Sequence, residues 1–176
     1  MIRWGKAKAQ EAKSHTQLPE QLAQLVPTKQ VQAVEPTTGD QWLVVNEAGL
    51  HLLGPKLEES VPWVMIEHLR FTGKNRQLTI SWSDPQAPVV QLQLRTVDPE
   101  QLMLSAKEHL DNSFVITRTK ELDNGQILRG AVRRDSAGEL FVVIRQTSKR
   151  KSATVAQVDE FEAELLEALG ETPKKD

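Results

Sequence analysis

Residues 41–53, QWLVVNEAGLHLL, contain two apolar runs that are separated by a short turn. The runs Gln41–Asn46 and Gly49–Leu53 have the length and the Val and Leu content of β-strands. Gly49 is available for a positive φ angle, which glycine can adopt at no steric cost and which would suit a tight turn between antiparallel strands. The stretch therefore predicts an antiparallel hairpin.

Further strand-like runs lie on both sides of this hairpin. They are Val31–Glu35, His68–Thr72, Gln77–Ser83 and Val89–Arg95. Leu78, Ile80 and Trp82 alternate with polar residues, as a strand with one buried face requires, and Leu92 and Leu94 follow the same pattern. Short strands at this spacing predict a meandering sheet that curls into a barrel or a sandwich.

A helix is predicted directly after these strands. Asp98-Pro99-Glu100 combines an N-cap acceptor, a first-turn proline and a carboxylate near the positive end of the helix. The pattern continues to about Asp111 through Leu102, Leu104, Ala106 and Leu110.

The strand period then returns for a three-stranded antiparallel meander. Its strands are Phe114–Leu122, Gln126–Arg134 and Glu139–Gln146, and a last amphipathic helix is expected from about Ala153 to Leu169.

The order of the elements in residues 30–111, several antiparallel strands followed by one helix, resembles the pleckstrin-homology-like (PH-like) barrel. The segments Trp42–Leu53 and Val61–Ile66 are similar to the hairpin and proline-tryptophan pattern of bacterial proteins of that type, and the whole chain, including Glu108–Val115, resembles an uncharacterised family of actinobacterial cytoplasmic proteins. The resemblance implies a fold but no activity, since this barrel hosts many unrelated binding roles. The turn Pro36–Asp40 has no Lys or Arg, so we do not expect it to bind a lipid headgroup.

The predicted fold class is therefore α+β: an antiparallel PH-like barrel capped by a helix, with an appended three-stranded meander and a C-terminal helix. The expected parts are an N-terminal extension with a short helix (1–29), the barrel and its capping helix (30–111), the meander with the last helix (112–170) and a tail (171–176).

The composition narrows the possible chemistry. The 176 residues include no cysteine, so disulfides and thiolate chemistry are absent, and a cytoplasmic location is expected. We see no apolar run long enough to span a membrane and no apolar segment behind the charged start Met1–Lys8, so neither membrane insertion nor secretion is expected.

Motifs for catalysis are missing as well. The four histidines, at positions 15, 51, 68 and 109, have no metal-ligand spacing, and neither a nucleophile elbow nor a glycine-rich phosphate loop occurs. We expect no enzyme, no metal and no cofactor.

The most suggestive feature is a basic block. Residues 118–151 carry nine basic and four acidic side chains, a net charge of +5, whereas residues 152–176 carry two and seven, a net charge of −5. The alternation of Arg129 with Arg133 puts both on one face of a strand, and Arg118 and Arg145 could join them. The candidate polyanion site is Arg118, Arg129, Arg133, Arg134, Arg145, Lys149, Arg150 and Lys151.

Two explanations of this block compete. Either the acidic C-terminal helix covers or flanks the basic face and neutralises it, or the face binds a nucleic acid or another polyanion. We favour the first because the sequence pI is near 6.1. The predicted function is then a non-enzymatic protein-binding module, an adaptor or scaffold that uses a barrel edge or a helix groove. Polyanion binding is the alternative, and a small-ligand carrier is a third reading.

Overall fold

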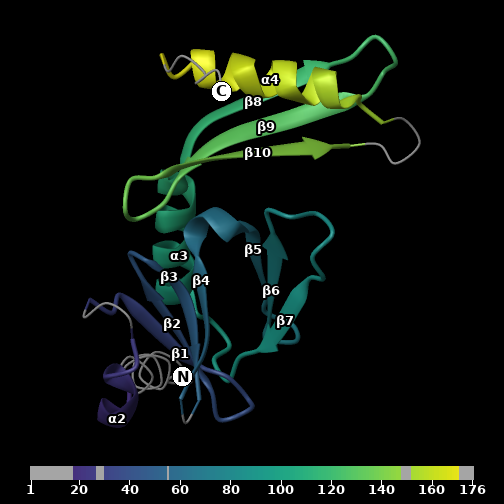
Figure 1. The fold of residues 1–176 in the computed structure, drawn as a ribbon. Helices are drawn as coiled ribbons and strands as arrows, with labels where there is room; N and C mark the ends of the chain where they lie inside the picture. The colour runs from purple at the N-terminus through teal and green to yellow at the C-terminus, as the bar shows by residue number, and fades with distance from the viewer. Residues whose placement is uncertain (1–17, 27–29, 55, 148–151, 171–176) are drawn as a thin grey trace, which may run out of the picture. The chain divides into compact units, whose positions relative to one another are not determined.

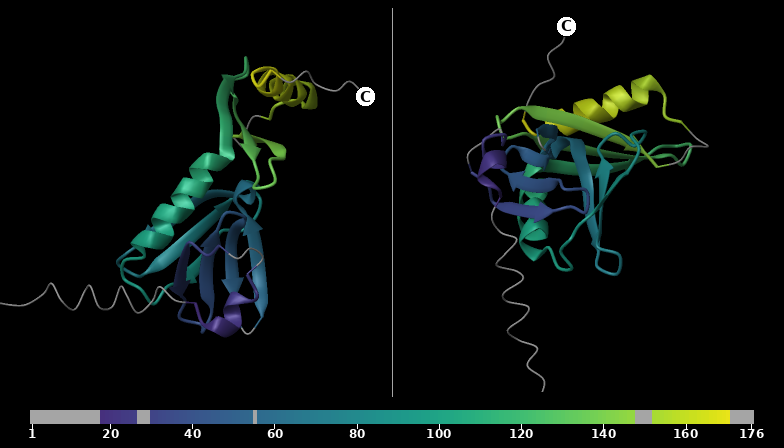
Figure 2. Two further views of the ribbon diagram at one scale, coloured as in Figure 1. Left: turned by 90° about the vertical axis from the view of Figure 1, so that its left-hand side faces the viewer. Right: turned by 90° about the horizontal axis from the view of Figure 1, so that it is seen from below.

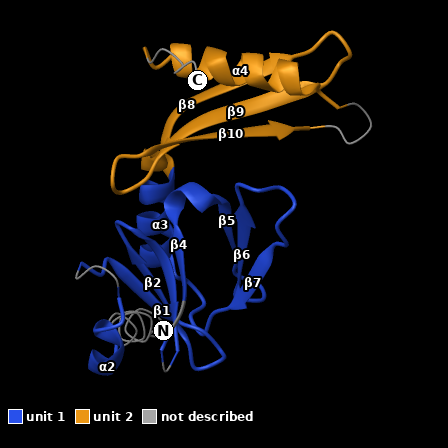
Figure 3. Cartoon of the chain, viewed as in Figure 1, with its two compact units in different colours: residues 1–110 blue, residues 111–176 orange. Residues whose placement is uncertain are grey.

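The computed structural model describes residues 18–26, 30–54, 56–147 and 152–170. The chain divides into two compact units, residues 1–110 and 111–176 (Figure 3). Each unit is described by itself. The finer four-part division expected from the sequence stays a prediction.

The first unit contains two antiparallel sheets and the greater part of one long helix (Figure 1). One sheet has the strand order β1-β2-β3-β4, and the other has the order β5-β6-β7. The elements are α2 (Glu20–Ala23), β1 (Ala33–Pro36), β2 (Trp42–Asn46), β3 (Gly49–Leu53), β4 (Leu57–Pro62), the 3₁₀ turn η1 (Trp63–Met65), β5 (Ile66–Thr72), β6 (Gln77–Trp82), β7 (Val90–Gln93) and α3 (Glu100–Ser113).

The predicted hairpin is confirmed, but the closed barrel is wrong. β2 and β3 pair through Val45↔Leu50 and the neighbouring residues, as residues 41–53 suggest. Among the described residues the two sheets meet in one isolated bridge, Thr37↔Leu94, and β4 does not pair with β5. Pro62 ends β4 because it has no backbone N–H to donate, and η1 then carries the chain into the second sheet.

Alternating strand residues form the core of the first unit. Leu78 and Ile80 of β6 are buried, as expected, and so is Leu94 after β7. The cross-strand pair Leu78↔Leu92 fixes the register between β6 and β7. Trp82 is only half-buried at the end of β6, where its indole N–H donates to the carbonyl of Pro88 at 2.8 Å.

α3 is held to the strands through one face. Leu102, Ala106 and Leu110 recur every four residues and are buried. His109 stacks on Trp63 of η1, with 5.4 Å between the ring centroids, and its Nε2 is hydrogen-bonded to the side chain of Gln32. The helix that was predicted to end near residue 111 therefore forms and continues to Ser113.

The second unit is a three-stranded antiparallel sheet with one helix. β8 (Phe114–Glu121), β9 (Ile127–Arg134) and β10 (Leu140–Gln146) have the order β10-β9-β8, which confirms the predicted meander. α4 (Val155–Glu167) begins at a capping box of Thr154 and Gln157.

α4 lies along one face of this sheet (Figure 2). The core between them contains Leu128 and Val132 of β9 with Phe161 and Leu165 of α4. Gly130 lies between the two β9 residues, and a Cβ atom there would come within 2.5 Å of Leu165 Cδ1 and 2.8 Å of Phe161 Cε1. The glycine therefore permits the close approach of helix and sheet. Among the described residues of the chain, no helix is long and apolar enough to cross a membrane.

Candidate functional site

A groove of about 360 Å³ lies between the strand β5 and the helix α3 in the first unit. Its volume is within the range of pockets that bind ligands. The lining residues are His68, Leu69, Glu100, Met103, Leu104, Lys107 and Leu110.

One face of α3 forms a wall of this groove. Glu100, Met103, Leu104 and Lys107 recur at the three- and four-residue spacing that brings side chains together along a helix. Leu104 is 58% exposed and so presents apolar surface to solvent on the side of the helix away from its packed face. The groove wall is thus apolar in its middle, with Glu100 and Lys107 on either side along the helix.

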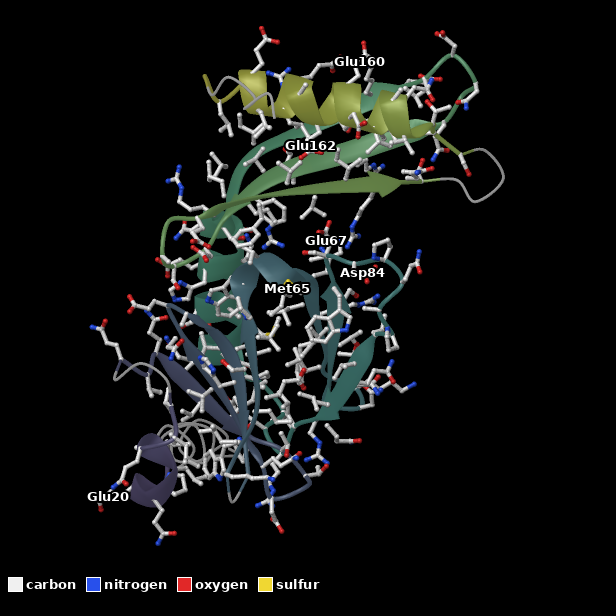
Figure 4. The ribbon with its side chains drawn as sticks, in the orientation of Figure 1. Glu20, Met65, Glu67, Asp84, Glu160 and Glu162 are labelled. Carbon is white, nitrogen blue, oxygen red and sulfur yellow. The ribbon has the colours of Figure 1, made fainter. Side chains whose placement is uncertain are left out.

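The other wall is an edge strand. β5 pairs with β6 on one side only, because the sheet order is β5-β6-β7. Met65, in η1 just before β5, is 54% exposed (Figure 4). An edge strand presents backbone donors and acceptors that can pair with another extended segment.

The interior of the first unit offers much less room. A hollow of about 30 Å³ is lined by apolar residues of both sheets, among them Leu43, Leu50, Ile80 and Trp82. That volume is about a tenth of the smallest typical ligand pocket, roughly 300 Å³. The hollow does not support the small-ligand carrier.

A buried polar cluster fixes the end of the β2–β3 hairpin. His51 Nε2 lies 2.8 Å from Asn46 Oδ1, and its Nδ1 lies 2.7 Å from Ser60 Oγ. Asn46 Oδ1 also accepts from the backbone N–H of Ala48 and Gly49, so Nε2 is the protonated ring nitrogen and Nδ1 accepts from the Ser60 hydroxyl. Burial lowers the pKa of His51 below its ordinary value of 6.5. The cluster is structural, because a neutral imidazole matches its hydrogen bonds.

The predicted basic site is divided between the two faces of the β8–β10 sheet. Cross-strand partners share a face, so Arg145, which pairs with Arg129, lies on the same face of the sheet. Arg118 pairs with Gly130 and therefore lies on the face that α4 covers. Arg134 pairs with Leu140, which packs against the core under α4, so it also belongs to that face.

Arg133 lies on the face of Arg129 but is not accessible. It is 0% exposed; its Nε lies 3.2 Å and its Nη2 2.5 Å from Ser113 Oγ, and its guanidinium is 4.2 Å from the ring centroid of Phe114. Its contacts stabilise the α3–β8 junction. Lys149, Arg150 and Lys151 lie outside the described residues.

The acidic helix α4 covers the face of the β8–β10 sheet opposite to the one that we expected. Lys120 of β8 bridges to Glu164 Oε1 at 2.7 Å and to Glu160 Oε2 at 3.3 Å, and the Glu164 hydrogen bond raises the pKa of Lys120. Lys120 pairs with Leu128 and so belongs to the α4 face. The expectation that the helix covers the face of Arg129 and Arg133 is therefore wrong, because the apolar stripe of α4 needs Leu128 and Val132.

Candidate metal ligands do not gather in the described part of the chain. His51, His68 and His109 belong to β3, β5 and α3, and no group of three or more His, Asp or Glu side chains among the described residues could hold a metal ion. His15 lies outside the described residues.

Comparisons with known proteins add little to this geometry. Neither a protein-family model nor a curated protein sequence matches the chain, so the resemblance to an actinobacterial family has no support from them. Among solved structures, the FERM and C-terminal domain complex of Drosophila Merlin is similar at 16% identity and a TM-score of 0.37, over 44% of this chain and 28% of that one. The chain thus spans less than a third of that protein's length.

Proposed function

We propose that the first unit is a PH-like fold and that the chain is a non-enzymatic, cytoplasmic protein-binding module. The partner enters as an extended peptide in the groove between β5 and α3. The observation that carries this proposal is an exposed apolar groove directly beside an edge strand.

Support for the PH-like fold comes from the order of elements. Seven antiparallel strands form sheets of four and three, and one long helix follows them. β1 and β7 approach at their ends, where the N–H of Thr38 donates to the carbonyl of Gln93 and the N–H of Arg95 to that of Pro36. The sheets thus bend toward each other without closing.

Support for a peptide partner comes from two complementary walls. An extended segment that adds to β5 satisfies its own backbone groups on the strand, and its alternate side chains point toward α3. Leu104 and Met103 then bury the apolar side chains of the peptide, while Glu100 and Lys107 favour opposite charges along it.

A selection from displayed random peptides tests this function. The peptides have roughly ten residues, enough to run along the seven-residue β5. Each selected peptide is then synthesised with a fluorescent label, and its affinity is measured by anisotropy for the native chain and for two variants.

Leu104→Glu puts a carboxylate into the groove, and Val89→Glu makes the same kind of change at a residue that is 54% exposed and outside the groove. Loss of the burial of Leu104, about 1.5–3 kcal/mol, corresponds to an affinity that is weaker by about 10- to 150-fold, whereas Val89→Glu should bind like the native chain. Peptides that bind both variants alike would contradict the proposed site.

A further inference from the structure

The strand β10 forms one edge of the sheet in the second unit, and little in its sequence discourages further pairing. Among the described residues it pairs with β9 alone, over seven residues and without a register shift. The run Leu140–Ile144 is apolar, the strand contains no proline, and Arg145 is its one charged residue. Edge strands usually carry charges, prolines or bulges that prevent the addition of another strand.

The opposite edge of the same sheet has these protective features. β8 has a register shift between Phe114 and Ile116, and its outer half carries charged side chains at Arg118, Lys120 and Glu121. The two edges of one sheet therefore differ, and only β10 is regular and apolar along its length.

The backbone groups that β10 offers follow from its pairing with β9. The N–H of Thr147 donates to the carbonyl of Ile127 at 3.1 Å, and the N–H of Asp135 donates to that of Glu139 at 3.0 Å. Because hydrogen-bonded pairs alternate along an antiparallel ladder, the odd-numbered residues of β10 bond to β9. The N–H and C=O groups that point outward belong to Leu140, Val142, Ile144 and Gln146.

We propose that two copies of this chain associate through β10, antiparallel to each other about a two-fold axis at Val143. This register uses all four outward-pointing residues, since Val142 pairs with the second copy's Ile144 and Leu140 with the second copy's Gln146. Two bonds in each of these pairs give about eight backbone hydrogen bonds in total. The association joins the two sheets edge to edge and does not involve the peptide groove.

The flank of α4 toward β10 indicates a second copy as the occupant. Glu160 and Glu164 lie on the flank toward β8, because both bond Lys120. At about 100° per residue, the other flank of the helix faces β10, and Figure 4 shows Glu160 and Glu162 on opposite sides of α4. The residues of that flank are Val155, which is 78% exposed, the half-buried Val158, Leu166 and Leu169, and Glu162.

Only a second copy covers both the edge and this flank. A two-fold axis at Val143 keeps both α4 helices on one face of the joined sheet. Each α4 packs over β9, so the helices lie about 14 Å apart, three strand spacings. Helices that are about 10–12 Å wide then nearly touch, above the half-buried Leu140, Val142 and Ile144 of both copies. A foreign peptide strand satisfies the edge but leaves the flank of α4 open.

The charges of β10 are compatible with this self-pairing. The two Arg145 side chains lie four residues apart along the strands, about 13 Å, which exceeds the screening length of roughly 8 Å at physiological salt. Each Arg145 lies opposite the second copy's Phe141, whose side chain is 40% exposed. A guanidinium that is hydrogen-bonded along its edge within its own sheet still presents its flat face to such a ring.

Sedimentation equilibrium of the whole chain tests the association. The mean mass should rise from 19.8 kDa toward twice that value over roughly 1 to 500 μM protein. Val143→Lys places two ammonium groups face to face at the axis and should weaken the dimer by at least about tenfold. Thr117→Lys adds the same charge to the same face on β8 and should leave the dimer unchanged.

Cysteine cross-linking tests the register, and the native chain has no cysteine to interfere. Val143→Cys puts two thiols at a non-hydrogen-bonded pair with about 4.5 Å between the Cα atoms, within the range of a disulfide. Mild oxidation should therefore link the copies. Phe141→Cys places its two thiols about 13 Å apart along the strands and should not link them.

A pair of helix variants distinguishes a second copy from a foreign strand. Leu166→Glu should weaken the dimer by roughly 3- to 10-fold, because it removes apolar surface between the helices. Ala156→Glu, on the outward side of α4, should not. Far-UV circular dichroism confirms that each variant is folded. A chain that stays at 19.8 kDa, a dimer that tolerates Val143→Lys or Leu166→Glu, or equal cross-linking at positions 141 and 143 would each overturn the proposal.

Discussion

Gly130→Val tests the packing that decides which face of the β8–β10 sheet is open. The Cβ atom that any other residue brings would lie 2.5 Å from Leu165 Cδ1 and 2.8 Å from Phe161 Cε1, well inside ordinary carbon contact distances. Both side chains are fully buried, so α4 has to shift. Overpacking of this kind costs about 1–3 kcal/mol, and the free energy of unfolding of the second unit should fall by that amount.

A double-mutant cycle separates this clash from a general effect of the substitution. Leu165→Ala removes the atom that the new side chain meets, and alone it should cost about 2–5 kcal/mol through the cavity it leaves. In the double variant the valine fills part of that cavity. Its loss of unfolding free energy should therefore be smaller than the sum of the two single losses by about 0.5–3 kcal/mol.

Amide hydrogen exchange is the suitable assay. All four tryptophans precede residue 111, so their fluorescence reports on the first unit, whereas exchange at β9 and α4 reports on the second directly. Urea denaturation, followed by far-UV circular dichroism, gives the free energy of unfolding of the whole chain. Additive costs in the cycle, or no cost for Gly130→Val, would refute the packing and with it the assignment of the open face.

The remaining predictions concern the first unit. Ile80→Ala should lower the free energy of unfolding by about 2–5 kcal/mol in chemical denaturation, because the side chain is 3% exposed in the core. A loss near zero would contradict the orientation of β6, in which Ile80 points into the core. Gly49→Ala should lower stability by about 1–3 kcal/mol or more, since its Cβ would lie 2.1 Å from the carbonyl oxygen of Val61, and backbone yields less readily than a side chain. The lowered pKa of His51 means that the unfolded chain binds its proton more readily, so this contribution to stability is complete above pH 6.5 and is lost as the pH falls below it. Unfolding free energies at about pH 7.5 and 5.5 should therefore differ less for His51→Gln than for the native chain, and an equal difference would contradict the neutral buried imidazole.

Local patterns in the sequence predict most elements because each of them buries one face. The alternation at Leu78 and Ile80 predicts β6, and the helix-start pattern Asp98-Pro99-Glu100 predicts α3, which begins at Glu100. β4 was missed, since Leu57–Pro62 is rich in polar residues. It is the edge strand of its sheet, where charged side chains are tolerated and discourage unwanted pairing.

The groove was not predictable from local patterns alone, because it depends on β5 and α3 lying side by side. One signal was present: Leu104 follows Leu102 by two residues and so lies off the buried stripe of Leu102, Ala106 and Leu110. Which face of the β8–β10 sheet α4 covers was predictable in principle. The apolar stripe of α4 must cover Leu128 and Val132, which leaves Arg129 on the opposite face.

Amide hydrogen exchange at His68–Thr72 of β5 tests the central claim, that the groove takes an extended peptide, most directly. The native chain is measured alone and with a saturating concentration of a peptide from the displayed library. Strand addition gives the outward-facing amides of β5 new hydrogen-bond partners, so their exchange should slow by at least about tenfold, while exchange at the interior pair of β2 and β3 stays the same. Unchanged exchange at His68–Thr72 in the saturated complex, or slowing only in the second unit, would contradict the account.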